Sequence, residues 1–393
     1  MLAEQVAALD GSALFVQGPP GTGKTYTGGR LAAALMRWGL RVGVAATSHK
    51  AIANLLREIE AAAGPFAGVK KSSEDNPESR YDSDRIRSED KTAAIAAGSD
   101  DLIAGTAWLW SDAAMREAVD VLFVDEAGQV SLADAIAMSQ GARSLVLLGD
   151  PQQLAHVSQG THPRGSGRSV LEHLLGEHNT VPPDRGVLLE TTWRMHPAVC
   201  EFVSRTMYDG RLHPVGGCEL QAVDSAGLTG VGLRMLDVPH EDNHQTAPAE
   251  AERIAAELDA LLAGGRWRDR HGDWRELTLD DILVVAPYNA QVRCLKGRLP
   301  DGARVGTVDK FQGQQAPVVF FSMTSSSGED IPRGMDFLFS RNRLNVAVSR
   351  AQALSVVVCS PRLRRTRCAS VEQMRLVNML CRFGESAGAT DRR

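Results

Sequence analysis

The sequence has no paired cysteines. Its six cysteines stand at positions 200, 218, 294, 359, 368 and 381, and no two of them form a C-x-x-C pair. Such pairs supply most ligands of zinc ribbons and iron–sulfur clusters, so sites of these kinds are excluded within the chain. Reduced thiols are the simplest interpretation, as in a reducing compartment.

Long apolar runs and an excess of basic charge are missing as well. No apolar run is long enough to span a bilayer, and the N-terminus lacks the basic-then-apolar pattern of a signal peptide. We therefore expect a cytoplasmic protein without a membrane partner. The formal net charge is −5, so a nucleic acid would have to be bound through local Lys and Arg side chains or backbone groups.

The residues that are present indicate two α/β domains. The chain has 393 residues, 43% of them apolar and 23% charged, which is the balance of a globular protein with more than one domain. Ten short apolar or β-branched runs alternate with helical patterns, as in buried parallel sheets. A turn-rich segment before residue 186 divides these ten runs five and five.

This division predicts the domain boundaries. We expect domain 1 at 1–185, domain 2 at 186–365, and a C-terminal helix with a disordered tail at 366–393. A polar, charged stretch at about 70–100 is expected to be a surface insertion. The first strand-like run already begins near residue 13, so we expect the chain to be one module of a longer polypeptide.

The most specific motif is "GPPGTGKT" at 18–25, which fits G-x-x-x-x-G-K-[ST] and lies between a strand and a helix. Glycines at 18, 21 and 23 let backbone N–H groups turn towards phosphate oxygens, and the N-terminus of the following helix favours the same anion. Lys24 can reach the β- and γ-phosphates, and Thr25 can bind Mg²⁺. The alternative is a glycine-rich turn that happens to contain a lysine.

Two adjacent carboxylates complete the pattern. The apolar run at 121–124 ends in Asp125 and Glu126. Asp125 would hold Mg²⁺, and Glu126 would orient and deprotonate the attacking water, which favours hydrolysis over passive binding. Both acids could instead be helix N-caps. In "LLGDPQQL" (147–154), a Gln just past a strand end could sense the γ-phosphate, although Asp-Pro is also a common turn.

The order of the segments resembles the superfamily 1 helicases. The similarity is to subgroup B, which includes the nonsense-mediated-decay RNA helicase and the nuclease-helicase of Okazaki-fragment processing, and it runs from about residue 13 to about 360. It rests on nine motifs in order, namely "QGPPGTGKT" (17–25), "ATSHKAI" (46–52), "AGTAW" (104–108), "VDEAGQ" (124–129), "GDPQQL" (149–154), "TTWRMHP" (191–197), "APYNAQ" (286–291), "VGTVDKFQGQQ" (305–315) and "RLNVAVSRA" (343–351).

This resemblance implies two tandem RecA-like P-loop NTPase domains with parallel sheets and ATP in the interdomain cleft. Arg194 and Arg350 match the arginines that reach the γ-phosphate, and Trp193 matches an aromatic that stacks on adenine. The catalytic set implied is Lys24, Thr25, Asp125, Glu126, Gln153, Arg194 and Arg350. The ATP-binding set is Gly18, Pro19, Pro20, Gly21, Thr22, Gly23, Lys24, Thr25, Trp193 and Gln315, with Mg²⁺ on Thr25 and Asp125. The alternatives are a surface ion pair for Arg350 and a core aromatic for Trp193. The family usually has Glu at the position of Gln315, so a contact made there loses its charge.

The resemblance also implies a path for a single nucleic-acid strand. Hydroxyls and backbone N–H groups would position phosphates, and aromatic rings would stack on bases. The matching residues are Thr47, Ser48, His49, Thr106, Trp108, Tyr288, Asn289 and Thr307. The alternative for the small residues is helix capping.

The function implied is that of an ATP-dependent helicase or translocase that moves 5′ to 3′ along single-stranded nucleic acid, with DNA favoured over RNA. The sequence is most similar to the helicase module of bacterial proteins in which such a helicase follows a RecB-like nuclease, so a nuclease module upstream is expected. Two alternatives stay open: an ATP-driven clamp or switch that does not unwind nucleic acid, and an unrelated P-loop phosphotransferase or ATPase.

Overall fold

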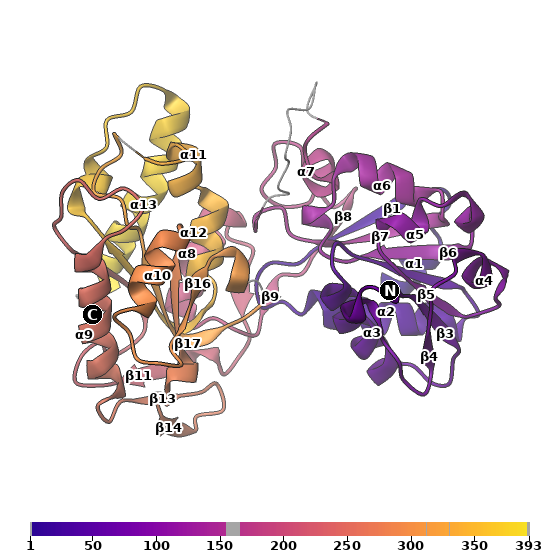
Figure 1. Ribbon diagram of the computed structural model, residues 1–393, viewed down its shortest axis with the longest axis horizontal. Helices are drawn as coiled ribbons and strands as arrows, with labels where there is room; N and C mark the ends of the chain where they lie inside the picture. Colours follow the sequence, from indigo (N-terminus) through magenta and orange to yellow (C-terminus); the bar gives the residue numbers. More distant parts are fainter. Residues whose placement is uncertain (1, 155–165, 312, 330, 391–393) are drawn as a thin grey trace. The chain divides into compact units, whose positions relative to one another are not determined.

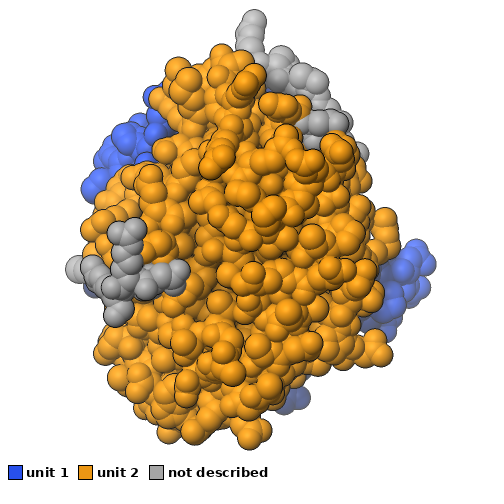
Figure 2. All heavy atoms as spheres, turned by 90° about the vertical axis from the view of Figure 1, so that its left-hand side faces the viewer, with its two compact units in different colours: residues 1–19, 23–189 blue, residues 20–22, 190–393 orange. Residues whose placement is uncertain are grey.

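The computed structural model describes residues 2–154, 166–311, 313–329 and 331–390. The described chain forms two compact units (Figure 2). The first comprises residues 1–19 and 23–189, and the second comprises residues 20–22 and 190–393. Each unit is described by itself.

The first unit is built on an eight-stranded, all-parallel sheet with the strand order β4-β3-β5-β2-β6-β7-β1-β8. Its strands are β1 (Ala13–Gln17), β2 (Val42–Ala45), β3 (Gly68–Lys71), β4 (Ile86–Glu89), β5 (Leu102–Ala104), β6 (Val119–Val124), β7 (Ala142–Gly149) and β8 (Gly186–Leu188). Its helices are α1 (Leu2–Ala7), α2 (Lys24–Arg37), α3 (His49–Ala62), α4 (Thr92–Ala97), α5 (Ala107–Trp110), α6 (Leu132–Ser139) and α7 (Val170–Leu175).

Helices cover both faces of this sheet. Neighbouring residues in a strand point to opposite faces. Phe15 therefore packs in one core with helices α5 and α6, whereas Val16 packs in the other core with α2 and α3 (Figure 1). Both side chains are buried. Two-sided burial explains why these strands are continuous apolar runs rather than alternating ones.

The second unit has a five-stranded parallel sheet with the order β12-β18-β17-β15-β16, a three-stranded antiparallel sheet, β11-β13-β14, and a short pair, β9-β10. The strands are β9 (Thr191–Thr192), β10 (His213–Pro214), β11 (Ala222–Asp224), β12 (Gly232–Asp237), β13 (Arg266–Arg268), β14 (Trp274–Glu276), β15 (Ile282–Ala286), β16 (Arg304–Thr307), β17 (Ala316–Ser322) and β18 (Ala351–Cys359). The helices are α8 (Pro197–Met207), α9 (Pro248–Leu262), α10 (Asn289–Lys296), α11 (Met335–Leu338), α12 (Arg341–Val348) and α13 (Val371–Thr390).

The structure differs from the predicted organisation in three places. Strand β8 pairs with β1 in the first sheet, so the first unit extends to Leu189 instead of 185 and the five-and-five division of strands is wrong. The stretch at 70–100 is more than an insertion on the surface, because β3 and β4 add two parallel strands to the sheet. Its polar composition fits strands near a sheet edge.

The third difference is at the C-terminus. Helix α13 continues to Thr390 through most of the segment predicted to be a disordered tail, and the last three residues lie outside the described part of the chain. Phe383 is fully buried and makes an edge-to-face contact with Phe202 of α8, with 5.5 Å between ring centroids. Gly384 lies against Met235 of β12. This packing supplies the apolar burial that a disordered tail would lack.

Candidate ATP and nucleic-acid sites

The phosphate loop follows β1 directly. Gly21 and Gly23 have φ values of 76° and 75°, the left-handed region that glycine adopts without strain. The ammonium of Lys24 donates to the Gly18 carbonyl at 2.7 Å, so the loop itself holds the lysine. Thr25 lies in the first turn of the 14-residue helix α2. The segment thus has the backbone and the helix N-terminus that a phosphate-binding loop requires.

Asp125 and Glu126 follow β6, which lies between β2 and β7 in the sheet. Asp125 is 3% exposed and accepts a hydrogen bond from the Glu126 N–H at 2.9 Å. Glu126 has φ 52°, an uncommon conformation for a residue with a side chain. This turn directs the two carboxylates differently although they are adjacent in sequence.

The electrostatics join these acids to the phosphate loop. Burial, and then the neighbouring charge of Glu126, raise the pKa of Asp125 to about 7, while Lys24 and the hydroxyl of Thr25 act in the opposite direction. The structure therefore brings Lys24, Thr25, Asp125 and Glu126 together. A buried carboxylate next to a threonine hydroxyl is a hard-oxygen donor set that fits Mg²⁺.

Gln153 follows β7, next to β6 in the sheet. It is 9% exposed, and its amide donates to the Asp150 carboxylate at 2.9 Å. The phosphate loop, the acid pair and Gln153 all follow neighbouring strands at the carboxyl edge of one parallel sheet, where ligands of such sheets bind.

The predicted nucleic-acid residues of the first unit share that edge, because they follow the adjacent strands β2 and β5. Thr47 and Ser48 are exposed, and the Ser48 hydroxyl also caps α3 by accepting the Ala51 N–H at 3.2 Å. Thr106 precedes α5 without a capping bond from its side chain. Trp108 is 87% exposed, a large apolar surface left in solvent.

His49 rests on a residue that the sequence gave no reason to select. Lys70 of β3 is fully buried, donates to the Ser79 carbonyl and lies 3.5 Å from the His49 ring. Burial lowers the pKa of Lys70 to about 8, and burial together with Lys70 lowers the pKa of His49. The short apolar start of β3, "GV", was the only sequence signal that this lysine belongs to a strand.

In the second unit, Arg194, Gln315 and Arg350 meet at the amino edge of the parallel sheet. Gln315 and Arg350 immediately precede the paired strands β17 and β18. Arg194 is 7% exposed and donates to Gln315 Oε1 at 2.9 Å and to the Ser349 carbonyl at 2.9 Å. Arg350 is 2% exposed and donates to the Gln314 carbonyl.

Two buried guanidinium groups thus lie close to each other. Burial, and then the charge of Arg350, lower the pKa of Arg194 to about 9. Such an arrangement favours the binding of an anion, which would relieve the repulsion. Trp193 is 55% exposed, and His196 caps α8 by accepting the Ala198 N–H at 3.1 Å.

The predicted nucleic-acid residues of the second unit lie at its carboxyl edge, after the paired strands β15 and β16. Asn289 is exposed and Thr307 is half-buried. Tyr288 is only 5% exposed, and its hydroxyl donates to the Pro332 carbonyl at 3.0 Å. Its ring packs against Phe337.

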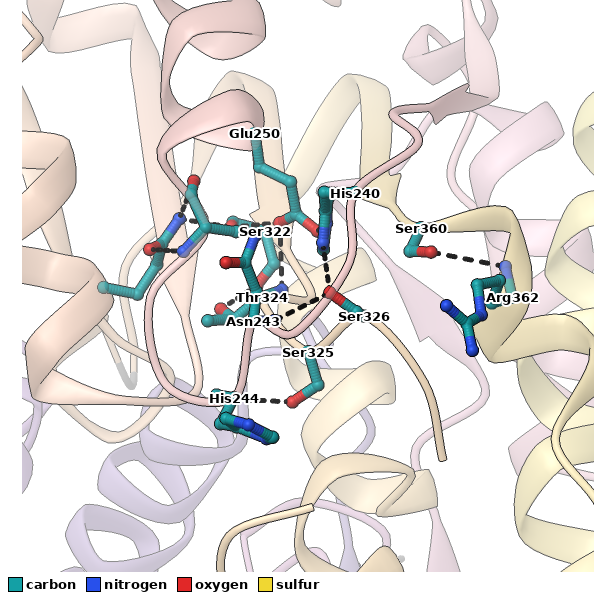
Figure 3. Close-up of polar contacts among 12 residues, drawn as sticks. His240, Asn243, His244, Glu250, Ser322, Thr324, Ser325, Ser326, Ser360 and Arg362 are labelled. Carbon is teal, nitrogen blue, oxygen red and sulfur yellow. Dashed lines mark hydrogen bonds and ion pairs between the residues drawn. The ribbon is translucent and has the colours of Figure 1, made fainter. Parts of the chain in front are cut away.

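A buried polar network supports this edge (Figure 3). Glu250 is fully buried, lies 2.9 Å from His240 Nε2, and accepts hydrogen bonds from the Ser322 hydroxyl and the Thr324 N–H. Gln291 of α10 donates to the same serine at 2.9 Å. The network therefore links the helix that begins at Asn289 to the end of β17.

Among the described residues, no helix is long and apolar enough to cross a membrane. All six cysteines are free thiols.

Comparisons with known proteins identify the family. A family model described as an AAA domain matches residues 166–362, half of the chain, and a second one with the same description matches residues 1–175. The chain is 26% identical over 368 residues to the "DNA replication ATP-dependent helicase/nuclease DNA2" of Gallus gallus, covering 89% of this chain and 35% of that protein. It is 26% identical over 424 residues to the "DNA-binding protein SMUBP-2" of Mesocricetus auratus, covering 88% of this chain and 41% of that protein.

The chain thus spans about two fifths or less of the length of these relatives. Among solved structures, an arterivirus nonstructural protein 10 (helicase) with DNA superposes with a TM-score of 0.48 at 18% identity, covering 91% of this chain and 62% of that chain. The family matches and the parallel α/β sheets of both units confirm the predicted fold of two tandem RecA-like domains. The chain belongs to the AAA-domain family and, within it, to the superfamily 1 helicases of the group that contains these relatives.

Proposed function

We propose that this chain is an ATP-dependent motor that hydrolyses ATP to move along single-stranded nucleic acid, as a helicase or translocase. The observation that carries the proposal is the constellation of Lys24, Thr25, Asp125 and Glu126 at the carboxyl edge of the first sheet, which shares that edge with the exposed Trp108. ATP chemistry and a base-stacking surface on one sheet edge are what a nucleic-acid motor needs. Family membership supports the same function.

The first unit would bind the triphosphate and start the reaction. The loop 18–25 would cradle the phosphates with its backbone N–H groups, and Lys24 would bind the β- and γ-phosphates. Mg²⁺, when bound by Thr25 and Asp125, supplies positive charge next to the phosphate oxygens. Glu126 would accept a proton from the attacking water, and Gln153 would sense the γ-phosphate.

The second unit would supply the remaining charge. We propose that Arg194 and Arg350 donate to the γ-phosphate as negative charge develops on it, since a guanidinium offers fixed bidentate donors. Their burial and mutual repulsion support this role, because an anion is the missing counter-charge. Trp193 would stack on adenine, and Gln315 would hold Arg194 in position through the bond between their side chains.

The nucleic-acid strand would lie on the carboxyl edges of the two parallel sheets. In the first unit Thr47, Ser48, His49 and Thr106 would position phosphates, and Trp108 would stack on a base. In the second unit Asn289 and Thr307 would contact the backbone. Tyr288 is proposed to contribute mainly as a support, because its ring is buried and its hydroxyl is already bonded.

We further propose that the strand is DNA rather than RNA, that movement is 5′ to 3′, and that the chain works with a nuclease module in a DNA-processing protein. The printed names of the relatives, a helicase/nuclease and a DNA-binding protein, support the DNA role. The cytoplasmic location stays a prediction, with which the free thiols agree.

The test is ATP turnover with and without single-stranded DNA or RNA, paired with a strand-displacement assay. A motor hydrolyses ATP faster with a single strand and displaces a partner strand. Stimulated turnover without displacement or translocation would favour a clamp or switch. Turnover that is indifferent to nucleic acid would favour an unrelated P-loop ATPase and would overturn the motor proposal.

A further inference from the structure

A pocket of about 410 Å³ lies beside Trp193 in the second unit. Its volume is in the range of small-molecule sites. Trp193, Arg194 and Gln315 line one side of it, and Trp267 and Arg270 line it from the β13–β14 hairpin. This hairpin is not part of any motif that carries the similarity to helicases.

The turn of the hairpin is rigid. The Asp269 carboxylate accepts the N–H groups of His271 at 2.8 Å and of Asp273 at 3.1 Å, and Gly272 has φ 93°. Gly217 packs on the Arg270 carbonyl so closely that a Cβ there would lie 2.7 Å from the oxygen. The backbone of Arg270 is therefore held in place on both sides.

Arg270 is used differently from its neighbours on the hairpin. Arg268 donates to the Leu220 carbonyl, and Arg275 pairs with the Asp281 carboxylate. The Arg270 guanidinium instead lies over the Trp193 ring, 5.4 Å from its centroid, and has no carboxylate within 4 Å in the described parts of the chain. A guanidinium over an aromatic face fixes the ring and adds positive charge next to it.

Trp267 provides a second, independent observation. It is 6% exposed and lines the same pocket, and its indole N–H has no hydrogen-bond acceptor among the described residues. Buried tryptophan N–H groups normally have a partner. A ligand in the pocket with an accepting nitrogen or oxygen would supply one.

We propose that the β13–β14 hairpin is part of the nucleotide site and binds the nucleoside portion of ATP. Arg270 is a positioning residue that braces Trp193 on one face, leaving the other face for the base. The Trp267 N–H donates to a nitrogen or oxygen of the base or ribose. This inference rests on the proposed function, because it adds residues to the same ATP site.

The experiment measures binding of ADP and of inorganic tripolyphosphate to the intact chain by titration calorimetry. Tripolyphosphate occupies the phosphate loop but has no nucleoside. The variants are Arg270→Ala and Trp267→Phe, with Arg266→Ala as the matched control, because Arg266 lies on the same strand over Trp274, outside the pocket. Thermal unfolding establishes that each variant is folded.

We expect Arg270→Ala and Trp267→Phe each to weaken ADP binding about 3- to 30-fold, as for loss of a cation–π contact or of one hydrogen bond. Tripolyphosphate binding should change less than about twofold, because these interactions involve only the nucleoside. Arg266→Ala should bind both ligands as the unmodified chain does. A folded Arg270→Ala variant with unchanged ADP affinity, or with an equal loss for tripolyphosphate, overturns the inference while the ATPase proposal stands. If the unmodified chain binds neither ligand, the proposed function itself fails.

Discussion

Replacing Arg194 with Met should make the nucleotide-free protein more stable and much less active. Arg194 is almost fully buried beside Arg350, and its pKa is lowered to about 9. An arginine ordinarily titrates above about 12, so keeping it charged at pH 7 costs about 4 kcal/mol, at about 1.4 kcal/mol per pH unit. Methionine fills similar space without the charge.

The gain is smaller than that cost. The substitution leaves Gln315 Oε1 and the Ser349 carbonyl without their donor, at about 1–1.5 kcal/mol each. We therefore expect a net stabilisation of about 1–2 kcal/mol, or roughly 2–8 °C in Tm. ATP hydrolysis stimulated by nucleic acid should fall at least about 10²-fold, in the range for loss of a donor to developing charge.

The pH dependence sharpens this prediction. Because the folded-state pKa is depressed, the penalty is fully present below about pH 9 and is relieved as pH rises above that value. The stability difference between Arg194→Met and the unmodified chain should thus be smaller at pH 10 than at pH 8 in urea unfolding. Arg211→Met is the matched control, since Arg211 is half-exposed and pairs with Glu190, and it should change stability by no more than about 0.5–1 kcal/mol. A destabilisation above about 1 kcal/mol, or near-normal turnover in Arg194→Met, would refute the reasoning.

Three further predictions concern the first unit. Lys24→Ala and Glu126→Gln should both abolish hydrolysis, but Glu126→Gln should still bind ATP, and near-normal turnover in it would remove Glu126 as the base. Trp108→Ala should weaken single-stranded DNA binding about 5- to 100-fold in fluorescence anisotropy, whereas Trp38→Ala, also on an exposed tryptophan, should not. Mg²⁺ affinity in the presence of ADP should fall as pH drops below 7, because the raised pKa of Asp125 lets a proton compete with the metal, and a pH-independent affinity between pH 5.5 and 8 would contradict this.

The parts of the site that could be predicted from the sequence are local. The phosphate loop and the acid pair each follow a buried strand directly, so residue type and position determine the geometry within a few residues. The carboxyl ends of neighbouring parallel strands then bring them together without further information.

The parts that could not be predicted depend on pairing between distant segments. Strand β8 has only three residues, and nothing local shows that it pairs with β1. Strands β3 and β4 lie in a charged stretch whose composition is typical of a loop, so Lys70 could not be placed beneath His49. Trp267 and Arg270 come from a small antiparallel sheet outside the helicase motifs, and only the folded chain brings them beside Trp193.

The measurement that tests the central claim most directly is displacement of streptavidin from biotinylated single-stranded DNA. A motor that moves 5′ to 3′ removes streptavidin from a 3′ end in an ATP-dependent manner, and Glu126→Gln does not. We expect this result for the intact chain, with much slower removal from a 5′ end. Absence of ATP-dependent displacement from either end, despite ATP turnover stimulated by the same DNA, would contradict the motor and leave an ATP-driven clamp.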